Sequence, residues 1–165
     1  MALVVEDGTG LAGAEAFVSV ADADTRHSNF GNTAWASAST EEREQALRKA
    51  TAYMEQAYRS KWKGTKLLRA QALSWPRYGA TVDGYTIDST LVPDEVANAC
   101  ADLALRALSD DLNADQTRAV VREKVGPLET EYSEASPQGT RYRAVDMALG
   151  PFLRFGSMNT TLVRA

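Results

Sequence analysis

The segment that begins at Ser39 constrains the fold most, because it combines a helix start signal with a long helical periodicity. Ser39 is followed three residues later by Glu42, the spacing of a capping box, and Glu41 adds a favourable charge to the first turn. Apolar side chains then recur on one helical face, at Leu47, Ala50, Met54, Ala57 and Tyr58. This pattern predicts a long amphipathic helix that ends near residues 61–64 and requires an apolar partner.

Two further helices are predicted by their first residues. Ser19 can cap a short helix over residues 20–29, which a Gly-Asn pair then stops. Pro93 suits the first position of another helix, and the acidic pair that follows it favours the same start. Cys100 lies on the apolar stripe of that helix, where a cysteine behaves as a small buried hydrophobic residue.

The C-terminal half is predicted to contain one β-hairpin followed by one helix. Gly126 and Pro127 separate two segments that alternate in part between apolar and charged residues, which predicts a β-hairpin near residues 119–132. A last helix is expected over residues 142–149, and the Gly-Pro pair that follows should kink or end it.

The predicted fold is therefore mainly α, a bundle of about four helices with a small β-hairpin and extended termini. Residues 1–154 are expected to form one domain, and residues 155–165 an extended tail. A length of 165 residues suits a single core. No apolar run approaches the roughly 20 residues that a membrane-spanning helix needs, so no membrane partner is expected. An acidic pair soon after the N-terminus argues against a signal peptide, and a cytoplasmic site of synthesis is expected.

The sequence contains no recognisable set of catalytic or metal-ligating residues. Cys100 is the only cysteine and His27 the only histidine, so neither a disulfide nor a cluster of these ligands can form within one chain. The glycine-rich stretch over residues 8–13 lacks the Lys-Ser/Thr of a phosphate-binding loop. We expect a protein that is not an enzyme and that needs no cofactor.

The charge balance argues against strong binding to duplex DNA. The formal net charge is −4 and the isoelectric point is about 5.1, whereas DNA-binding proteins carry a basic surplus or a basic face. A local basic patch is still compatible with these values. The C-terminal part has arginines interleaved with aromatic residues, which suits nucleic-acid contact or, with more weight, protein contact.

Four segments in order along the chain carry a resemblance to a known family. They are the N-terminal residues 1–10 with 16–23, the segment Gln71-Ala72-Leu73-Ser74-Trp75-Pro76-Arg77, the helix start Val92-Pro93-Asp94-Glu95-Val96, and the turn Val125-Gly126-Pro127. Together they resemble a phage family whose members often carry the label DnaT-like single-stranded-DNA-binding protein. The second segment is similar to the Q-A-L-x-W-P-R hallmark of that family.

The resemblance implies a head–tail connector, or adaptor, in the neck of a tailed-phage virion. Such subunits form a ring, of twelve copies in related proteins, between the portal protein and a tail-side neck protein. Double-stranded DNA passes through the ring without sequence-specific binding. The expected location is the virion, after assembly in the host cytoplasm. The main alternative is a single-stranded-DNA-binding replication-accessory protein, and a tail-terminator or joining protein of the same neck is a third possibility.

The resemblance also points to residues for these contacts. By position, the portal-binding extension corresponds to the C-terminal tail, with Phe155, Met158, Leu162, Val163 and Arg164 as candidate contacts. Trp75, Arg77, Gly126 and Pro127 are candidates for either a subunit interface or a core anchor. For Trp75 the core is favoured, because the following proline restricts its local geometry.

Overall fold

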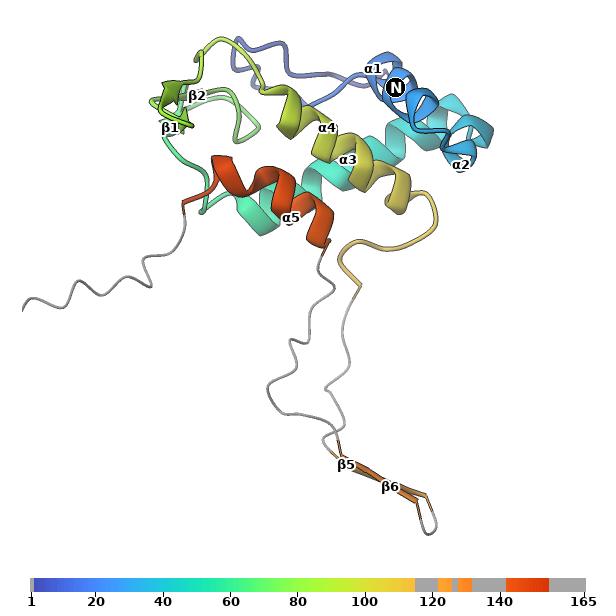
Figure 1. Cartoon of the computed structure of the whole chain (residues 1–165). Coiled ribbons are helices and arrows are strands. Elements are labelled where there is room, and N and C mark those ends of the chain that lie inside the picture. Colours follow the sequence, from blue (N-terminus) through green and yellow to red (C-terminus); the bar gives the residue numbers. More distant parts are fainter. Residues whose placement is uncertain (1, 115–121, 126–127, 132–141, 155–165) are drawn as a thin grey trace, which may run out of the picture.

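A computed structural model describes residues 2–114, 122–125, 128–131 and 142–154. It confirms the mainly α fold with a small β component (Figure 1). Five α-helices are present among these residues, one more than the sequence indicated. None of the described helices is long and apolar enough to span a bilayer.

The extra helix is short and lies in the N-terminal third. Helix α1, Val20–Asn29, is capped by the Ser19 side chain as predicted, and α2, Thr33–Ser37, follows directly. Five residues are too few for a helical periodicity to be visible in sequence. Tertiary contacts stabilise α2 instead: the indole of Trp35 is buried, and its Nε1 donates to Asp24 Oδ1 at 2.7 Å.

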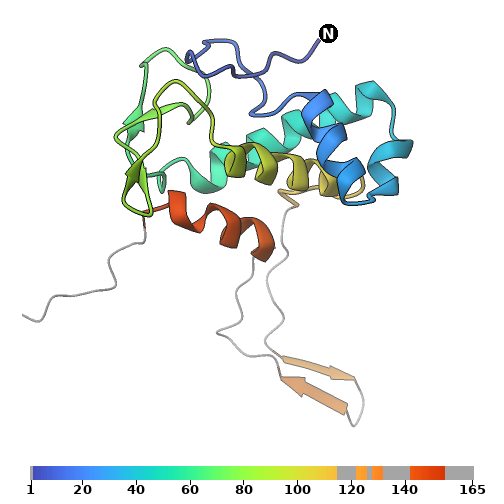
Figure 2. The ribbon, with the colours of Figure 1, turned by 45° about the horizontal axis from the view of Figure 1, so that its top comes forward.

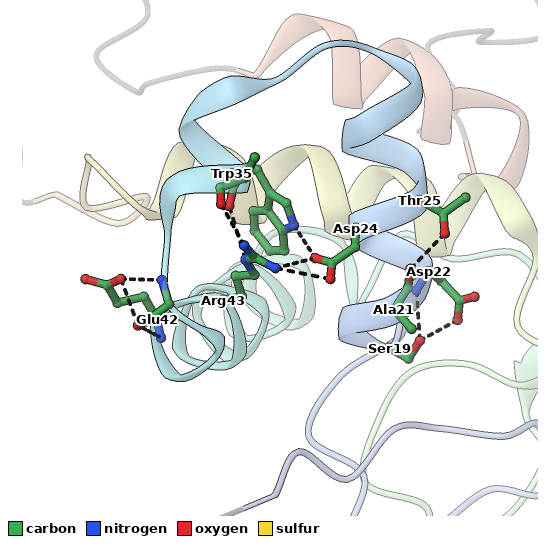
Figure 3. Close-up of polar contacts among 10 residues, drawn as sticks. Ser19, Ala21, Asp22, Asp24, Thr25, Trp35, Glu42 and Arg43 are labelled. Atoms are coloured by element: carbon green, nitrogen blue, oxygen red, sulfur yellow. Dashed lines mark hydrogen bonds and ion pairs between the residues drawn. The ribbon is translucent and has the colours of Figure 1, made fainter.

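Arg43 holds the corner between α1, α2 and α3 together. Its guanidinium donates to both carboxylate oxygens of Asp24 at 3.1 Å and to the carbonyl oxygens of Trp35 and Ala36 (Figure 3). The contacts satisfy carbonyl groups at the end of a helix too short to be stable alone. His27 packs against the Trp35 ring and contacts the Ala101 carbonyl oxygen on a different helix.

The core lies between α3, Thr40–Tyr58, and α4, Asp94–Ala107, which form the central pair of helices (Figures 1 and 2). The capping box at Ser39 is present as predicted. Pro93 is the N-cap of α4 rather than its first residue. Small alanines on α4 are buried together with its larger apolar residues, so the two backbones can pack closely.

Helix α5, Arg143–Leu149, packs against α4 and continues as the 3-10 helix η1, Gly150–Phe152. The change of helix type falls at the Gly-Pro pair that was expected to kink this segment. Tyr58 Oη donates to Asp146 Oδ1 at 2.6 Å and so ties the end of α3 to α5.

Three antiparallel two-stranded sheets complete the described structure. Strands β1, Thr65–Lys66, and β2, Arg77–Tyr78, pair across a loop, and β3, Thr81–Val82, pairs with β4, Tyr85–Thr86. The predicted hairpin is formed by β5, Arg122–Val125, and β6, Leu128–Glu131. Figures 1 and 2 show this hairpin apart from the helical body.

Cys100 provides a direct test of the packed core. Its side chain is fully buried on α4, and burial raises the pKa of the thiol to about 11. Because only the thiolate attacks disulfide reagents, we expect labelling by a thiol reagent at pH 8 to be slow in the folded protein and fast in denaturant. Rapid stoichiometric labelling of the native protein would show that the α3–α4 core opens far more readily than this packing implies.

Candidate basic surface of the loop module

The segment between α3 and α4 differs in charge from the remainder of the chain. We call residues 59–87 the loop module; it contains β1 to β4. It carries six Lys and Arg residues and one acidic residue, Asp83, although the whole chain has a net charge of −4. Figure 1 shows the module at the end of the helical body opposite α1 and α2.

The Arg77 side chain links several main-chain segments of the module. Its guanidinium is buried and donates to the carbonyl oxygens of Lys63 at 2.6 Å, Gly64 at 2.8 Å and Ser74 at 3.0 Å. Gly64 must be glycine, because its φ is +68° and a Cβ would lie 2.4 Å from the Tyr78 carbonyl oxygen. One planar side chain therefore joins both sides of the loop that leads from β1 to β2.

Gln71 and Glu55 satisfy further main-chain groups of this loop. The buried amide of Gln71 donates to the carbonyl oxygens of Leu73 and Pro76 and accepts from the Leu68 N–H at 2.7 Å. Glu55, on α3, accepts from both the N–H and the hydroxyl of Ser74. Because buried polar groups are costly when unpaired, these side chains fix the loop in one conformation.

Trp75 anchors the module to the core of its own chain. Its ring is fully buried and meets Trp62 and Phe152 edge to face, with ring centroids 5.8 and 5.9 Å apart. Tyr58 extends this aromatic row to the end of α3. The Trp75–Pro76 peptide bond is cis. The hallmark-like segment thus supplies Gln71, Trp75 and Arg77 as interior supports of the loop.

The end of the described C-terminal region is also fixed to the module. Leu153 bridges to Trp62, and the Arg154 N–H donates to the Lys61 carbonyl oxygen at 2.6 Å. The Arg154 guanidinium reaches the Gly64 carbonyl oxygen at 2.8 Å. These contacts add a further cation to the basic end of the molecule.

The interior cations of the module are close enough to influence one another. Burial lowers the pKa of the Lys66 ammonium, Glu55 opposes this change, and the charges of Arg59 and Arg77 lower it further. Burial likewise lowers the pKa of Arg77, and the charge of Arg154 adds to that effect. The positive charge is therefore concentrated, with Glu55 as its acidic neighbour.

Several side chains of the module face solvent. Arg59, Lys61 and Arg69 are exposed, and Arg59 and Arg69 make no hydrogen bond or ion pair with any described residue. Tyr78 is 69% exposed and Tyr85 79% exposed, so two aromatic rings lie on the same module. Exposed cations and exposed aromatic rings on one module suit a ligand that carries negative charge and flat apolar surface.

Three arginines of the helical body have carboxylate partners, whereas the exposed Lys49, Arg106 and Arg143 form no ion pair with a described residue. Arg26 forms a bidentate pair with Asp102 at 2.8 Å, Arg43 pairs with Asp24, and Arg48 pairs with Glu15 and Glu44. Within the described part of the chain, no group of His, Cys, Asp and Glu residues could hold a metal ion.

Of the candidate contact residues from the sequence, the structure brings Trp75 and Arg77 together, both buried in one chain. Gly126 and Pro127 lie outside the described residues, as do Phe155, Met158, Leu162, Val163 and Arg164. The sequence reasoning missed the exposed set of the loop module, which is Arg59, Lys61, Arg69, Tyr78 and Tyr85. A count of charge by segment would have found it, because this basic stretch lies within an acidic chain.

The fold and this surface define a small, mainly helical protein with a rigid basic and aromatic loop module at one end. The chain belongs to the family described as "Putative DnaT-like ssDNA binding protein", whose sequence model matches residues 1–165. Neither the curated proteins nor the solved structures contain a match to the chain.

Proposed function

We propose that the protein is a structural subunit of a tailed-phage virion, a head–tail connector that forms a ring between the portal and the tail. Residues 71–77 and the other landmark segments resemble the phage family labelled DnaT-like single-stranded-DNA-binding protein, and we take that resemblance to imply a place in the virion neck. The β5–β6 hairpin is the structural observation that carries it.

Within the residues that the structure describes, β5 and β6 form a separate two-stranded sheet. Figures 1 and 2 show it beyond α4 and α5, and its strands pair only with each other. An isolated two-stranded hairpin is at best marginally stable in water, so a partner that covers it would stabilise it. A ring subunit has such partners on both sides, because heterologous interfaces join different faces of adjacent copies.

Deletion of residues 155–165 is expected to leave a folded protein that no longer docks on the portal. Arg154 is the last residue with contacts to the body among those described, so the deletion removes no described contact. The measurement is negative-stain imaging of each protein mixed with its portal, with circular dichroism to verify folding. Rings that cap the portal in the full-length sample alone would support the proposal.

A matched control replaces residues 119–132 by a short Gly-Ser linker and keeps the C-terminal segment. This variant should still reach the portal through its tail, but should give incomplete rings. Normal docking by the chain that lacks residues 155–165 would contradict the role given to that segment. Failure of the full-length protein to associate with the portal would contradict the connector proposal itself.

The second candidate function is single-stranded DNA binding in replication, and two observations favour it. The description of the matched family names single-stranded DNA and makes no mention of a connector. The loop module adds a basic and aromatic surface that the net charge had concealed. Of the two candidates, the family description thus supports this second one.

The salt dependence of oligonucleotide binding distinguishes a single-strand-binding protein from a connector. A single-strand-binding protein should bind a fluorescent oligothymidine with an affinity that falls steeply as salt rises, because released counterions contribute to binding. A connector that acts only as a conduit should bind the oligonucleotide weakly and should cap the portal.

A further inference from the structure

We propose that Arg59, Arg69, Tyr78 and Tyr85 form a binding surface for single-stranded nucleic acid on the loop module. The inference rests on the second candidate function and assigns it to residues. It names an unpaired strand as the ligand, with phosphates on the arginines and bases stacked on the tyrosines.

The loop module has the surplus of positive charge that a nucleic acid requires. It contains six cations and a single acidic residue, so it keeps a surplus of positive charge even with Glu55 of α3 as a neighbour. Four cations of this region, Lys63, Lys66, Arg77 and Arg154, donate to main-chain carbonyl oxygens and are thereby held in place. Their charges are thus held in fixed positions on the module, and a polyanion gains from positive charges that need no rearrangement.

Arg59 and Arg69 are two cations of the module that are available for direct contact with a phosphate. Both are exposed, and neither contacts an acceptor within the described residues. Arg59 ends α3, where the carbonyl end of a helix favours a cation, and Arg69 lies in the loop that Gln71 and Arg77 support. A guanidinium can donate two parallel hydrogen bonds to one phosphate.

The exposed rings of Tyr78 and Tyr85 favour a single strand over a duplex as the ligand. Tyr78 is opposite Thr65 in the β1–β2 pair, and Tyr85 is opposite Val82 in the β3–β4 pair, so each ring stands on a strand of a small sheet. In a duplex the faces of the bases are stacked on each other and unavailable to protein rings. Unpaired bases can stack on tyrosine, so this surface favours a single strand.

The test compares two variants that change net charge equally in the full-length protein. R59E/R69E reverses the proposed surface, whereas K49E/R143E reverses two exposed cations elsewhere on the helical body. Binding of a labelled 20-mer oligothymidine is measured by fluorescence anisotropy from low to moderate salt. We expect R59E/R69E to weaken binding at least tenfold and to lower the slope of log affinity against log salt by about 1.4, the value for two lost phosphate contacts.

The aromatic half of the surface is tested separately with Y78A/Y85A, and F30A removes a similarly exposed ring from the end of α1. Each tyrosine should contribute about tenfold to affinity with little change in the salt slope. Thermal melts verify folding, and R59Q/R69Q serves as the second charge variant if R59E/R69E does not fold.

Three results would overturn the assignment. If the unmodified protein does not bind the oligonucleotide, both the second candidate function and this surface are wrong. If it binds and the loop-module variants behave like their controls, DNA binding stands and the assignment to this surface is wrong. If the loop-module variants block ring formation on the portal without a change in oligonucleotide binding, the surface is a protein interface.

Discussion

Replacement of Trp75 by alanine is expected to lower the free energy of unfolding by about 3–5 kcal/mol, the range for loss of a large buried aromatic residue. The ring is fully buried and contacts the rings of Trp62 and Phe152. Its removal would leave a cavity where α3, the loop module and η1 meet. Since small domains have only about 5–15 kcal/mol of stability, the variant should be close to unfolding at physiological temperature. Urea denaturation followed by circular dichroism measures the change.

Two control variants test whether the stability loss of W75A comes from removal of a buried ring. W75F retains an aromatic ring and should lose less stability than W75A. Y85A removes a ring that is 79% exposed and should change the free energy of unfolding by no more than about 0.5 kcal/mol. A W75A protein as stable as Y85A would contradict the position of Trp75 in the core of a single chain.

Replacement of Arg77 by lysine, with its charge retained, is expected to cost about 2–4 kcal/mol of stability. The guanidinium satisfies carbonyl oxygens of Lys63, Gly64 and Ser74 at once. A lysine ammonium lacks the planar arrangement of donors and can reach only part of this set. Each buried carbonyl group left without a donor costs about 1–3 kcal/mol, although the Gly64 oxygen also accepts from Arg154.

The same urea titration measures R77K, and the exposed R69K is its matched control. R69K should be nearly neutral, because Arg69 makes no hydrogen bond or ion pair with a described residue. Equal stability of R77K and R69K would mean that charge alone, without the geometry of the guanidinium, holds the loop module together.

The helix starts could be predicted from sequence because capping is a local interaction. Ser19 bonds to the N–H of Asp22, and the reciprocal contacts of Ser39 and Glu42 span three residues, so each signal lies within a short window of sequence. The mainly α fold and the hairpin followed from equally local patterns. Helix α2 did not, because its five residues depend on contacts with Asp24 and Arg43.

The long-range contacts of the loop module could not be predicted, because they join residues that are far apart in sequence. Arg154 and Gly64 are separated by 90 positions, and Arg77 and Lys63 by 14. No periodicity reports such contacts. The sequence did predict that Trp75 and Arg77 matter, but not that they act as internal supports for exposed neighbours. Overall net charge obscured those neighbours, because acidic residues in the rest of the chain outweigh one basic segment.

Helix α5 and η1 together act as a spacer of fixed length. Arg143 lies at one end of this helical segment, and at the other end Leu153 and Arg154 are bound to the loop module. Ten residues of helix give a separation of roughly 15 Å, at 1.5 Å per residue. The start of α5 is therefore held at a set distance from the loop module, and an insertion in α5 would change that distance and rotate Arg143 relative to the module.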